Sequence, residues 1–169
     1  VGATEAVSTT MHFAILLLCK HPEIQTTIYN ELAALQQQQK SDGIVLNSAN
    51  IAQIPYLRSL VHETLRLYPV TVATAPRAIR KSFMVDDVQS NCGELKSYRI
   101  PEGSLLHINT IAIARNPKYW SKGTGDVNMD ELHLEFWMNE QGKFVMHREA
   151  FTTFSIGKRD CIGRALAVK

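Results

Sequence analysis

A glycine-rich loop with a single cysteine lies near the end of the 169-residue chain, where residues 154–163 read Phe-Ser-Ile-Gly-Lys-Arg-Asp-Cys-Ile-Gly. A helix-forming run, residues 164–168, follows directly. The free N–H groups at the start of a helix and a nearby cation both favour a thiolate over a thiol. Glycines let the backbone approach something large and flat. The loop therefore indicates a metal-bound thiolate at Cys161, and the alternative is a small buried hydrophobic cysteine.

The composition is that of an ordinary globular protein with enough length for one core, at 45% hydrophobic and 20% charged residues. The net charge of +2 is too small to indicate a nucleic-acid partner. The three cysteines, Cys19, Cys92 and Cys161, lie far apart. They lack the spacing of a zinc site or a disulfide-rich protein, which favours a reducing compartment.

Three helices are predicted in the first part of the chain. The first covers residues 2–19 and is apolar nearly all round after Met11, a pattern typical of deep burial. Its apolar run, 13–19, is too short to cross a bilayer, which needs about 20 residues. The second helix begins near Pro22 and ends before a turn at 41–43. One apolar stripe of this helix is formed by Ile24, Ile28, Leu32 and Leu35.

The third helix covers residues 56–68, and Pro69 ends it. Short β-rich runs follow at 71–73, 83–85 and 104–108. Residues 109–114 are compatible with helix or strand, and 116–147 form a long, weakly structured stretch. The fold class expected from this order is mainly α with minor β, without a flexible interdomain linker.

The loop pattern Phe-x-x-Gly-x-Arg-x-Cys-x-Gly resembles the haem-ligand loop of the cytochrome P450 family, and all five fixed positions match. The resemblance implies a role for each of the five residues. These are Cys161 as the axial thiolate on the haem iron, Phe154 as the ring that shields the sulfur, Gly157 as a sharp turn, Arg159 as a haem-propionate partner and Gly163 as the close approach to the porphyrin. A thiolate ligand favours cleavage of the O–O bond.

Glu63 and Arg66 lie three residues apart on the third helix and therefore share a face. Taken alone they indicate a surface ion pair, but the leucines around them favour partial burial. They resemble the Glu-x-x-Arg helix of the same family, followed here by Leu67-Tyr68-Pro69. In that family the pair braces the meander behind the haem loop, and a further arginine completes a triad. Phe136 stands in the place of that arginine.

Arg77 follows the third helix and, by resemblance, binds a haem propionate, since a guanidinium suits a carboxylate; the alternative is a solvated arginine. The residues before it would line the substrate side, and their small, apolar character favours an apolar small-molecule substrate. They are Val70, Thr71, Val72, Ala73, Thr74 and Ala75.

The start of the first helix, Gly-Ala-Thr-Glu at residues 2–5, resembles the oxygen-side motif of the family. There an acid precedes an alcohol that helps to deliver protons. Glu5 supplies the acid, but Ala6 stands where threonine is usual. Thr9 and Thr10, one turn further on, are the candidate replacements through a water molecule. Glu5 is alternatively a first-turn acid that favours the helix dipole.

Two further features lie outside these motifs. Residues 89–96 resemble an insertion in the β-hairpin before Tyr98. Lys158, Arg164 and Lys169 flank the cysteine and form a basic patch, which suits an acidic electron donor or is simply a solvated face.

The resemblance covers the whole chain and corresponds to the C-terminal part of a family member, so residues 1–169 are expected to be a partial cytochrome P450 domain cut at both ends. It implies a haem-thiolate monooxygenase that holds haem b and inserts one atom of O2 into an apolar substrate. Electrons would come from NADPH through a flavin reductase or another donor. An N-terminal anchor outside these residues would attach the protein to the cytosolic face of the endoplasmic reticulum membrane.

Two other functions stay open. One is a haem-thiolate isomerase or dehydratase that works without O2, which Ala6 favours. The other is a non-catalytic haem-binding or scaffold fragment, which the expected truncation favours. The segment alone is expected to be inactive, to fold poorly and to hold haem weakly.

Overall fold

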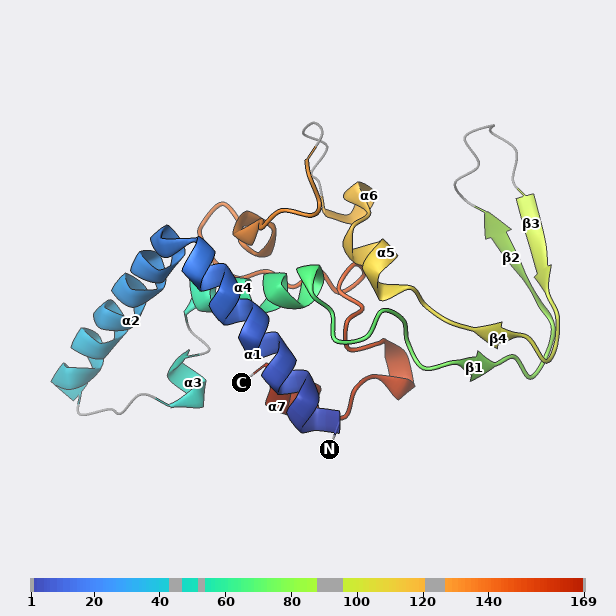
Figure 1. Ribbon diagram of the computed structural model, residues 1–169, viewed down its shortest axis with the longest axis horizontal. Coiled ribbons are helices and arrows are strands. Elements are labelled where there is room, and N and C mark those ends of the chain that lie inside the picture. Colours follow the sequence, from blue (N-terminus) through green and yellow to red (C-terminus); the bar gives the residue numbers. More distant parts are fainter. Residues whose placement is uncertain (1, 43–46, 52–53, 88–95, 121–126, 169) are drawn as a thin grey trace. The chain divides into compact units, whose positions relative to one another are not determined.

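The computed structural model describes residues 2–42, 47–51, 54–87, 96–120 and 127–168. The chain divides into two compact units, one made of residues 1–72 and 110–169 and the other of Ala73–Asn109. The first unit holds all the described helices and the second holds the four strands (Figure 1). The mainly α class with minor β is therefore confirmed.

Helix α4 (Pro55–Leu67) is the central element of the first unit and contacts α1, α2, α5 and η1. Its first residue is a proline, whose fixed φ suits the first turn of a helix. Tyr68 N–H donates to Thr64 O at 2.8 Å and closes the last turn before Pro69. From Ser59 to the end of α4, every residue except Val61 is buried. The third predicted helix is thus confirmed within one residue at each end.

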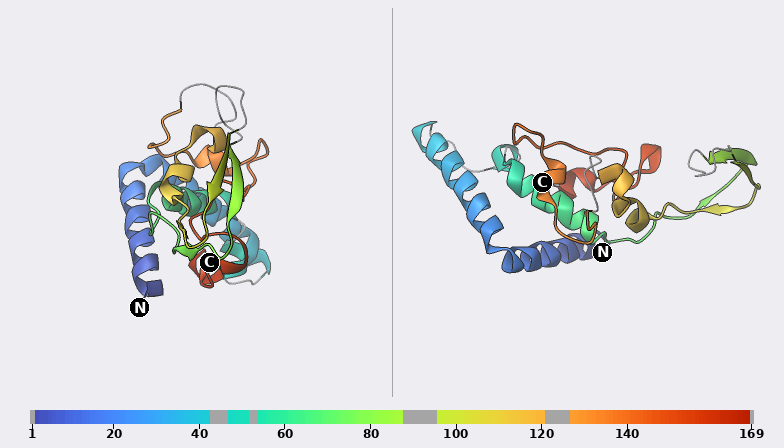
Figure 2. Two further views of the ribbon diagram at one scale, coloured as in Figure 1. Left: turned by 90° about the vertical axis from the view of Figure 1, so that its right-hand side faces the viewer. Right: turned by 90° about the horizontal axis from the view of Figure 1, so that it is seen from above.

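Helices α1 (Gly2–Lys20) and α2 (Pro22–Asp42) pack against each other and against α4 (Figures 1 and 2). Their shared core consists of Leu17, Ile24, Ile28, Leu60 and Leu134. Leu32 packs at its edge, so most of the predicted stripe is confirmed. Helix α2 runs through the first two residues of the turn predicted at 41–43, since glutamine and lysine are good helix formers. The short helix α3 (Ser48–Ile51) follows.

The prediction that α1 is deeply buried is wrong for this structure. Leu17 is its buried residue, whereas Met11, Ile15 and Leu16 are 58%, 55% and 45% exposed. The physical reason is that α2 and α4 cover only one face of α1. The whole helix, with a mean hydropathy of 1.3, also has the length and composition to cross a membrane, a property that it shares with core helices and signal sequences.

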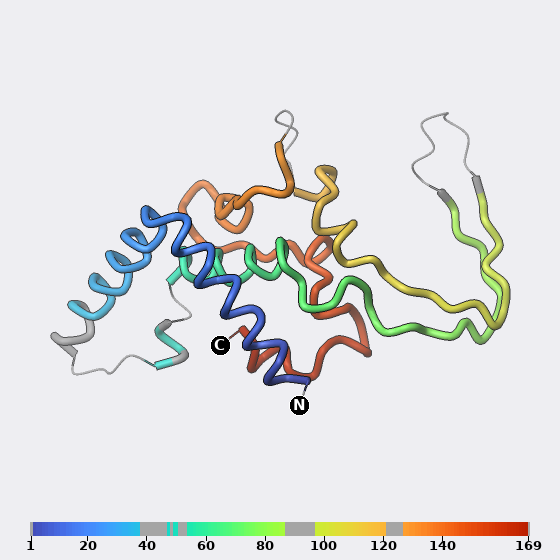
Figure 3. Tube along the Cα trace, viewed as in Figure 1, coloured from blue at the N-terminus to red at the C-terminus, as the bar shows by residue number. Residues whose placement is uncertain are grey.

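A second core lies where α4 meets the short elements later in the chain. These are α5 (Thr110–Ala114), α6 (Pro117–Trp120) and the 3-10 helix η1 (Leu134–Trp137). The buried members of this core are Leu65, Trp120, Met129, Trp137, Ala150 and Phe151. The chain then runs back along α4 to η2 (Gly157–Arg159) and α7 (Arg164–Ala167), as the tube in Figure 3 shows. Helix is therefore the correct one of the two alternatives for 109–114.

The second unit consists of two small antiparallel pairs. β1 (Arg77–Ala78) pairs with β4 (Leu105–Leu106), and β2 (Phe83–Asp87) pairs with β3 (Lys96–Ile100), which confirms the hairpin before Tyr98. Gly103 takes a φ of +83° in the turn before β4, a conformation that favours glycine. The insertion predicted at 89–96 lies outside the described residues except for its last residue, which begins β3.

The strand predicted at 71–73 is wrong for two of its three residues. Ala73 forms an isolated bridge with Asn109. The carbonyls of Thr71 and Val72 instead accept hydrogen bonds from the side chain and backbone of Thr110, the first residue of α5. The backbone at 71–72 is therefore used to anchor a helix start rather than a sheet.

Candidate haem-binding site

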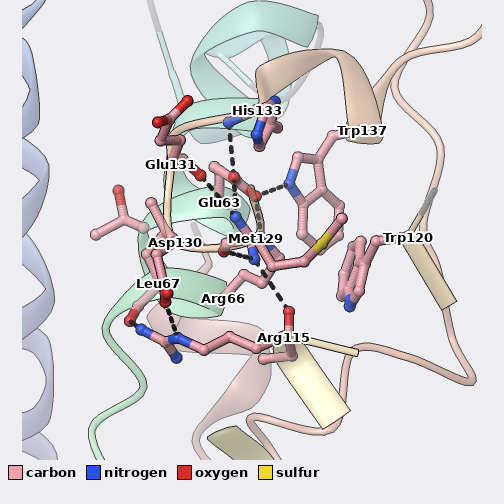
Figure 4. Close-up of polar contacts among 12 residues, drawn as sticks. Glu63, Arg66, Leu67, Arg115, Trp120, Met129, Asp130, Glu131, His133 and Trp137 are labelled. Atoms are coloured by element: carbon pink, nitrogen blue, oxygen red, sulfur yellow. Dashed lines mark hydrogen bonds and ion pairs between the residues drawn. The ribbon is translucent and has the colours of Figure 1, made fainter. Parts of the chain in front are cut away.

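All five N–H groups of Arg66 have an acceptor in the structure (Figure 4). Two of them meet Glu63, since Nε donates to Oε2 and Nη2 donates to Oε1, both at 2.7 Å. The other three reach backbone carbonyls of Ala114 (3.0 Å), Met129 (2.8 Å) and Glu131 (2.9 Å). The guanidinium on α4 thus ties α5 and the segment before η1 to one helix.

The Glu63 carboxylate is equally saturated, because each oxygen accepts two hydrogen bonds. Besides Arg66, Oε1 accepts the backbone N–H of His133 and Oε2 accepts the indole N–H of Trp137, both at 2.8 Å. Trp137 is fully buried and lies on η1. Figure 4 shows His133 and Trp137 approaching Glu63 from one side and Arg66 from the other.

The ion pair is fully buried, whereas the sequence suggested partial burial. Both side chains are 0% exposed. Burying two charges costs several kcal/mol per ion unless the geometry is good and the remaining donors and acceptors are satisfied. Here the bidentate contact and the complete set of partners meet both conditions. Glu63 and Arg66 therefore join the meander, residues 127–138, to α4.

Phe136 occupies the place of the usual triad arginine without making a hydrogen bond through its side chain. The Cζ of Arg66 lies 5.6 Å from the Phe136 ring and 5.7 Å from the Trp120 ring, within cation–π range. Sequence reasoning missed Trp137 as a partner of Glu63, although a buried indole N–H generally needs an acceptor. The available signal was the position of Trp137 directly after Phe136, where the arginine is missing.

A second basic residue, which no sequence pattern singles out, also ties the meander to α4. Arg115 donates from Nε to Asp130 and from Nη2 to the carbonyl of Leu67 at 3.0 Å (Figure 4). The Leu67 carbonyl lies in the last turn of α4, where carbonyls lack partners within the helix. Arg115 therefore caps α4 while it holds Asp130.

His62, next to Glu63, lies among aromatic rings behind the cysteine loop. Its ring centroid is 4.7 Å from Phe144 and 5.3 Å from both Phe151 and Trp137. Burial lowers the pKa of His62 to about 4, and the positive charge of Arg58 acts in the same direction, although a hydrogen bond to the Arg58 carbonyl opposes it. The imidazole is therefore neutral in the folded protein near pH 7.

The cysteine loop is a tight turn built on positive φ angles. Ser155 and Gly157 take φ values of +63° and +74°, and Cys161 N–H donates back to the Phe154 carbonyl at 2.8 Å. Thr153 donates from Oγ1 to the Leu65 carbonyl at 3.3 Å and so links the loop to α4. Gly157 therefore takes a backbone conformation that favours glycine, in keeping with the turn that the family resemblance implies.

The surface around Cys161 suits a large, flat, apolar group that carries a metal. The cysteine is exposed, and so are three apolar side chains of the same segment: Ile156 (46%), Ile162 (103%) and Leu166 (76%). A Cβ added to Gly163 would lie 3.8 Å from the sulfur, so the loop itself leaves room at this position. An exposed cysteine in a segment that also exposes apolar side chains fits haem, which is apolar except for its propionates.

Charged residues of the loop differ in their surroundings. Arg159 and Lys158 are exposed on η2. Arg164 is half-buried, with its Cζ 5.9 Å from the Phe154 ring, so it is not a purely solvated cation. Lys169 lies outside the described residues. The helix predicted after the cysteine is a single turn, and Arg164 N–H donates to the Cys161 carbonyl.

The predicted oxygen-side residues lie together on α1. Glu5 and Thr9 are exposed, and Thr10 is half-buried. The Thr10 hydroxyl donates to the Ala6 carbonyl at 3.0 Å, four residues back along the helix. The Thr10 hydroxyl is thus engaged with its own helix.

The predicted residues of the second unit and the segment before it occupy varied positions. Arg77 is half-buried on β1, opposite Leu106. Thr74 is buried, and its Oγ1 accepts the Ile108 N–H at 3.1 Å. Ala73 is half-buried, and the remaining members of the predicted substrate-lining segment are exposed: Val70, Thr71, Val72 and Ala75. Their roles stay predictions.

Comparison with known proteins agrees with this geometry. The chain is 31% identical over 166 residues to the mitochondrial cholesterol side-chain cleavage enzyme of Hypanus americanus, which covers 98% of the chain and 27% of that enzyme. It is 28% identical over 167 residues to human cytochrome P450 2A6, and 30% identical over 166 residues to cytochrome P450 2L1 of Panulirus argus. These matches cover 99% and 98% of the chain and 30% of each relative.

The chain therefore spans less than a third of the length of these relatives. The cytochrome P450 family model matches residues 1–168, from the helix with the predicted oxygen-side motif to the last turn behind Cys161. With the saturated Glu63–Arg66 pair and the cysteine loop at the positions that the family pattern requires, the chain belongs to the cytochrome P450 family.

Proposed function

We propose that the protein is a haem-thiolate monooxygenase acting on an apolar organic substrate. The observation that carries this proposal is the exposed Cys161 thiol on a loop that also exposes Ile156 and Ile162 and is linked to α4. The chemistry that haem b supplies when bound is the insertion of one atom of O2 into the substrate, with two electrons from a partner. Residues 1–169 would form part of one such domain.

The loop residues divide the work of holding the haem. Cys161 would bind the iron as a thiolate, and Phe154, the first residue of the loop, would shield the sulfur from water. The resemblance to the family assigns a haem propionate to Arg159 and, separately, to Arg77, since a guanidinium binds a carboxylate through two parallel hydrogen bonds. Gly163 lets the backbone pass close to the porphyrin, because any side chain there would occupy that space.

Two other segments would supply the substrate pocket and the proton path. The small and apolar residues at 70–75 line the substrate pocket. Glu5, Thr9 and Thr10 on α1 would move protons through water on the oxygen side of the haem, with Glu5 as the acid and the hydroxyls as carriers. To pass a proton on, Thr10 would have to turn its single O–H away from the Ala6 carbonyl, to which it donates.

The electron source and the location follow from the same proposal. NADPH supplies electrons through a flavin reductase or another acidic donor, which the exposed Lys158 and neighbouring cations attract. We place the protein at a membrane, on the cytosolic face of the endoplasmic reticulum, through a segment outside these residues. A mitochondrial membrane is the other candidate, since one of the relatives is a mitochondrial enzyme.

The test of this proposal is the ferrous–CO spectrum of the haem-loaded protein. Thiolate ligation gives a Soret band at unusually long wavelength, and Cys161→Ser should abolish it. Cys19→Ser is the matched control, because Cys19 is also exposed but lies on α1. A long-wavelength band that survives Cys161→Ser, or that Cys19→Ser also abolishes, would contradict the assignment of Cys161 as the ligand.

A second function is favoured by one specific observation. Ala6 carries no alcohol, and the Thr10 hydroxyl is already engaged with the Ala6 carbonyl. A haem-thiolate isomerase or dehydratase would need no proton relay to bound oxygen. Turnover of a peroxide or oxime without reductase and without O2 would support this second function, and strict dependence on both would exclude it.

A further inference from the structure

We propose that Trp137 replaces the missing triad arginine as the third partner of the Glu63 carboxylate, and that it positions the Cys161 loop through Phe151 and Phe154. The side chain at position 136, where the family pattern puts the arginine, is a phenylalanine without a donor. The neighbouring indole instead donates to Glu63 Oε2 at 2.8 Å. The part of the inference that concerns Cys161 rests on the proposed haem-thiolate function.

Two adjacent residues, Phe136 and Trp137, together take over the contacts of the missing arginine. Trp137, with 0% exposure, supplies the hydrogen bond. Phe136 is half-buried, and its ring covers the Arg66 guanidinium while it stacks on His133 at a centroid distance of 4.7 Å. His133 in turn donates its backbone N–H to the other oxygen of Glu63. Both side chains therefore contact the Glu63–Arg66 pair, Trp137 through a hydrogen bond and Phe136 through packing.

The charge of the cluster explains why a neutral donor is sufficient. The Glu63 carboxylate and the Arg66 guanidinium cancel, and all the other partners in the cluster are neutral carbonyl, amide or indole groups. The indole N–H satisfies the fourth acceptor position of the carboxylate without adding charge.

Trp137 also lies at the start of an unbroken set of contacts that ends at the cysteine. Its ring meets Phe151 edge-on at 5.1 Å, and Phe151 meets Phe154 edge-on at 5.9 Å. The Phe154 carbonyl accepts the Cys161 N–H at 2.8 Å. A shift of the Trp137 ring therefore displaces the two phenylalanines and, through one backbone hydrogen bond, the cysteine.

The experiment compares Trp137→Phe with Trp120→Phe in the haem-loaded protein. Trp120 is a matched control, because it is buried in the same core but its indole N–H donates to the Ile113 carbonyl. We expect Trp137→Phe to convert the thiolate form of the ferrous–CO complex to the shorter-wavelength form about ten times faster than wild type, since a hydrogen bond to a charged group is lost. Trp120→Phe should change this rate less than about threefold.

The decisive variant is the double substitution Phe136→Arg with Trp137→Phe. It returns a donor to the position used in the family, so it should restore most of the thiolate stability and the unfolding midpoint in urea. Equal effects of Trp137→Phe and Trp120→Phe, or no rescue by the arginine, would overturn the inference. If Trp137→Phe does not fold, recovery of folding in the double variant supports the inference and failure to recover overturns it.

The outcome also separates this inference from the proposed function. A wild-type protein without a thiolate band would overturn both the haem-thiolate function and the positioning role. Rescue of the urea midpoint by Phe136→Arg would then still decide whether Trp137 is the third partner of Glu63. A thiolate band that is insensitive to Trp137→Phe would leave the function intact and overturn the positioning role.

Discussion

The indole N–H of Trp137 and the backbone N–H of His133 reach the two oxygens of Glu63 from one segment, although Trp137 lies 74 residues further along the chain. The helix that carries Glu63 is thereby fixed to η1, and Arg66 on the same helix is fixed to α5 and to the segment before η1. One buried ion pair therefore connects α4 with α5, η1 and the segment before η1. The substitutions with the largest expected effect on stability lie at this pair.

Arg66→Lys should strongly destabilise the protein. An ammonium has three donors and no planar fork, so it cannot replace the five contacts of the guanidinium, and Glu63 would keep a buried charge with an incomplete set of partners. We expect a loss of about 3–5 kcal/mol in the free energy of unfolding, measured by urea denaturation of the haem-loaded protein. A loss below about 1 kcal/mol would contradict this account.

Asp130→Asn is the control for this prediction. It removes one partner from a pair whose carboxylate is 72% exposed, so the expected loss is less than about 1 kcal/mol. Arg115 would keep its hydrogen bond to the Leu67 carbonyl.

The helix with the ion pair could be predicted from the sequence, but its connections could not. Pro55 and Pro69 delimit α4, and the spacing of Glu63 and Arg66 on one face follows from helix geometry alone. The identity of the third partner depends on how the meander folds back onto α4, and that path is set by tertiary packing of Trp120, Trp137 and their neighbours. Local patterns carry no information about such a path.

The exposure of α1 could not be predicted from the sequence for a similar reason. The apolar residues of a helix indicate how much of its surface is shielded from water when all its neighbours are in place. Met11, Ile15 and Leu16 are exposed because the described elements reach only the face that carries Leu17. The pattern predicted the helix correctly, and it could not predict which faces these 169 residues would cover.

Acidification should destabilise the fold through His62. Its pKa is about 4 in the folded protein against an ordinary value of 6.5, so the unfolded chain binds the proton more tightly. The stabilisation is complete above about pH 6.5 and is lost as the pH falls towards 4, by on the order of 2–3 kcal/mol. Urea unfolding between pH 4 and 7 measures this slope.

His62→Gln should flatten the pH dependence, because an amide does not titrate and can still donate to the Arg58 carbonyl. The control is His12→Gln, which changes an exposed histidine on α1. An equally steep pH dependence in His62→Gln and wild type would assign the acid sensitivity to other groups.

Gly157→Ala and Gly142→Ala should separate folding from haem binding. Both glycines take positive φ angles, +74° and +69°, and an added Cβ meets open space at both, so each substitution should cost about 1–2 kcal/mol of stability through backbone strain. Only Gly157 lies in the cysteine loop. Haem retention, measured by transfer to an acceptor protein, should fall for Gly157→Ala alone, and a similar fall for Gly142→Ala would show that stability explains the loss.

Ala6→Thr should improve the use of electrons if the protein is a monooxygenase. The substitution places a hydroxyl at the position where the family carries its proton-donating alcohol, one residue after Glu5, without removing the hydrogen bond that Thr10 donates to the Ala6 carbonyl. Proton delivery by a positioned side chain raises rates substantially, so we expect a severalfold higher ratio of product formed to NADPH consumed. Val7→Thr adds the same hydroxyl one residue further along α1 and serves as the control. The thiolate band should be unchanged in both variants, because neither residue belongs to the cysteine loop. An unchanged product ratio in Ala6→Thr, together with turnover that does not require O2, would instead favour the isomerase or dehydratase function.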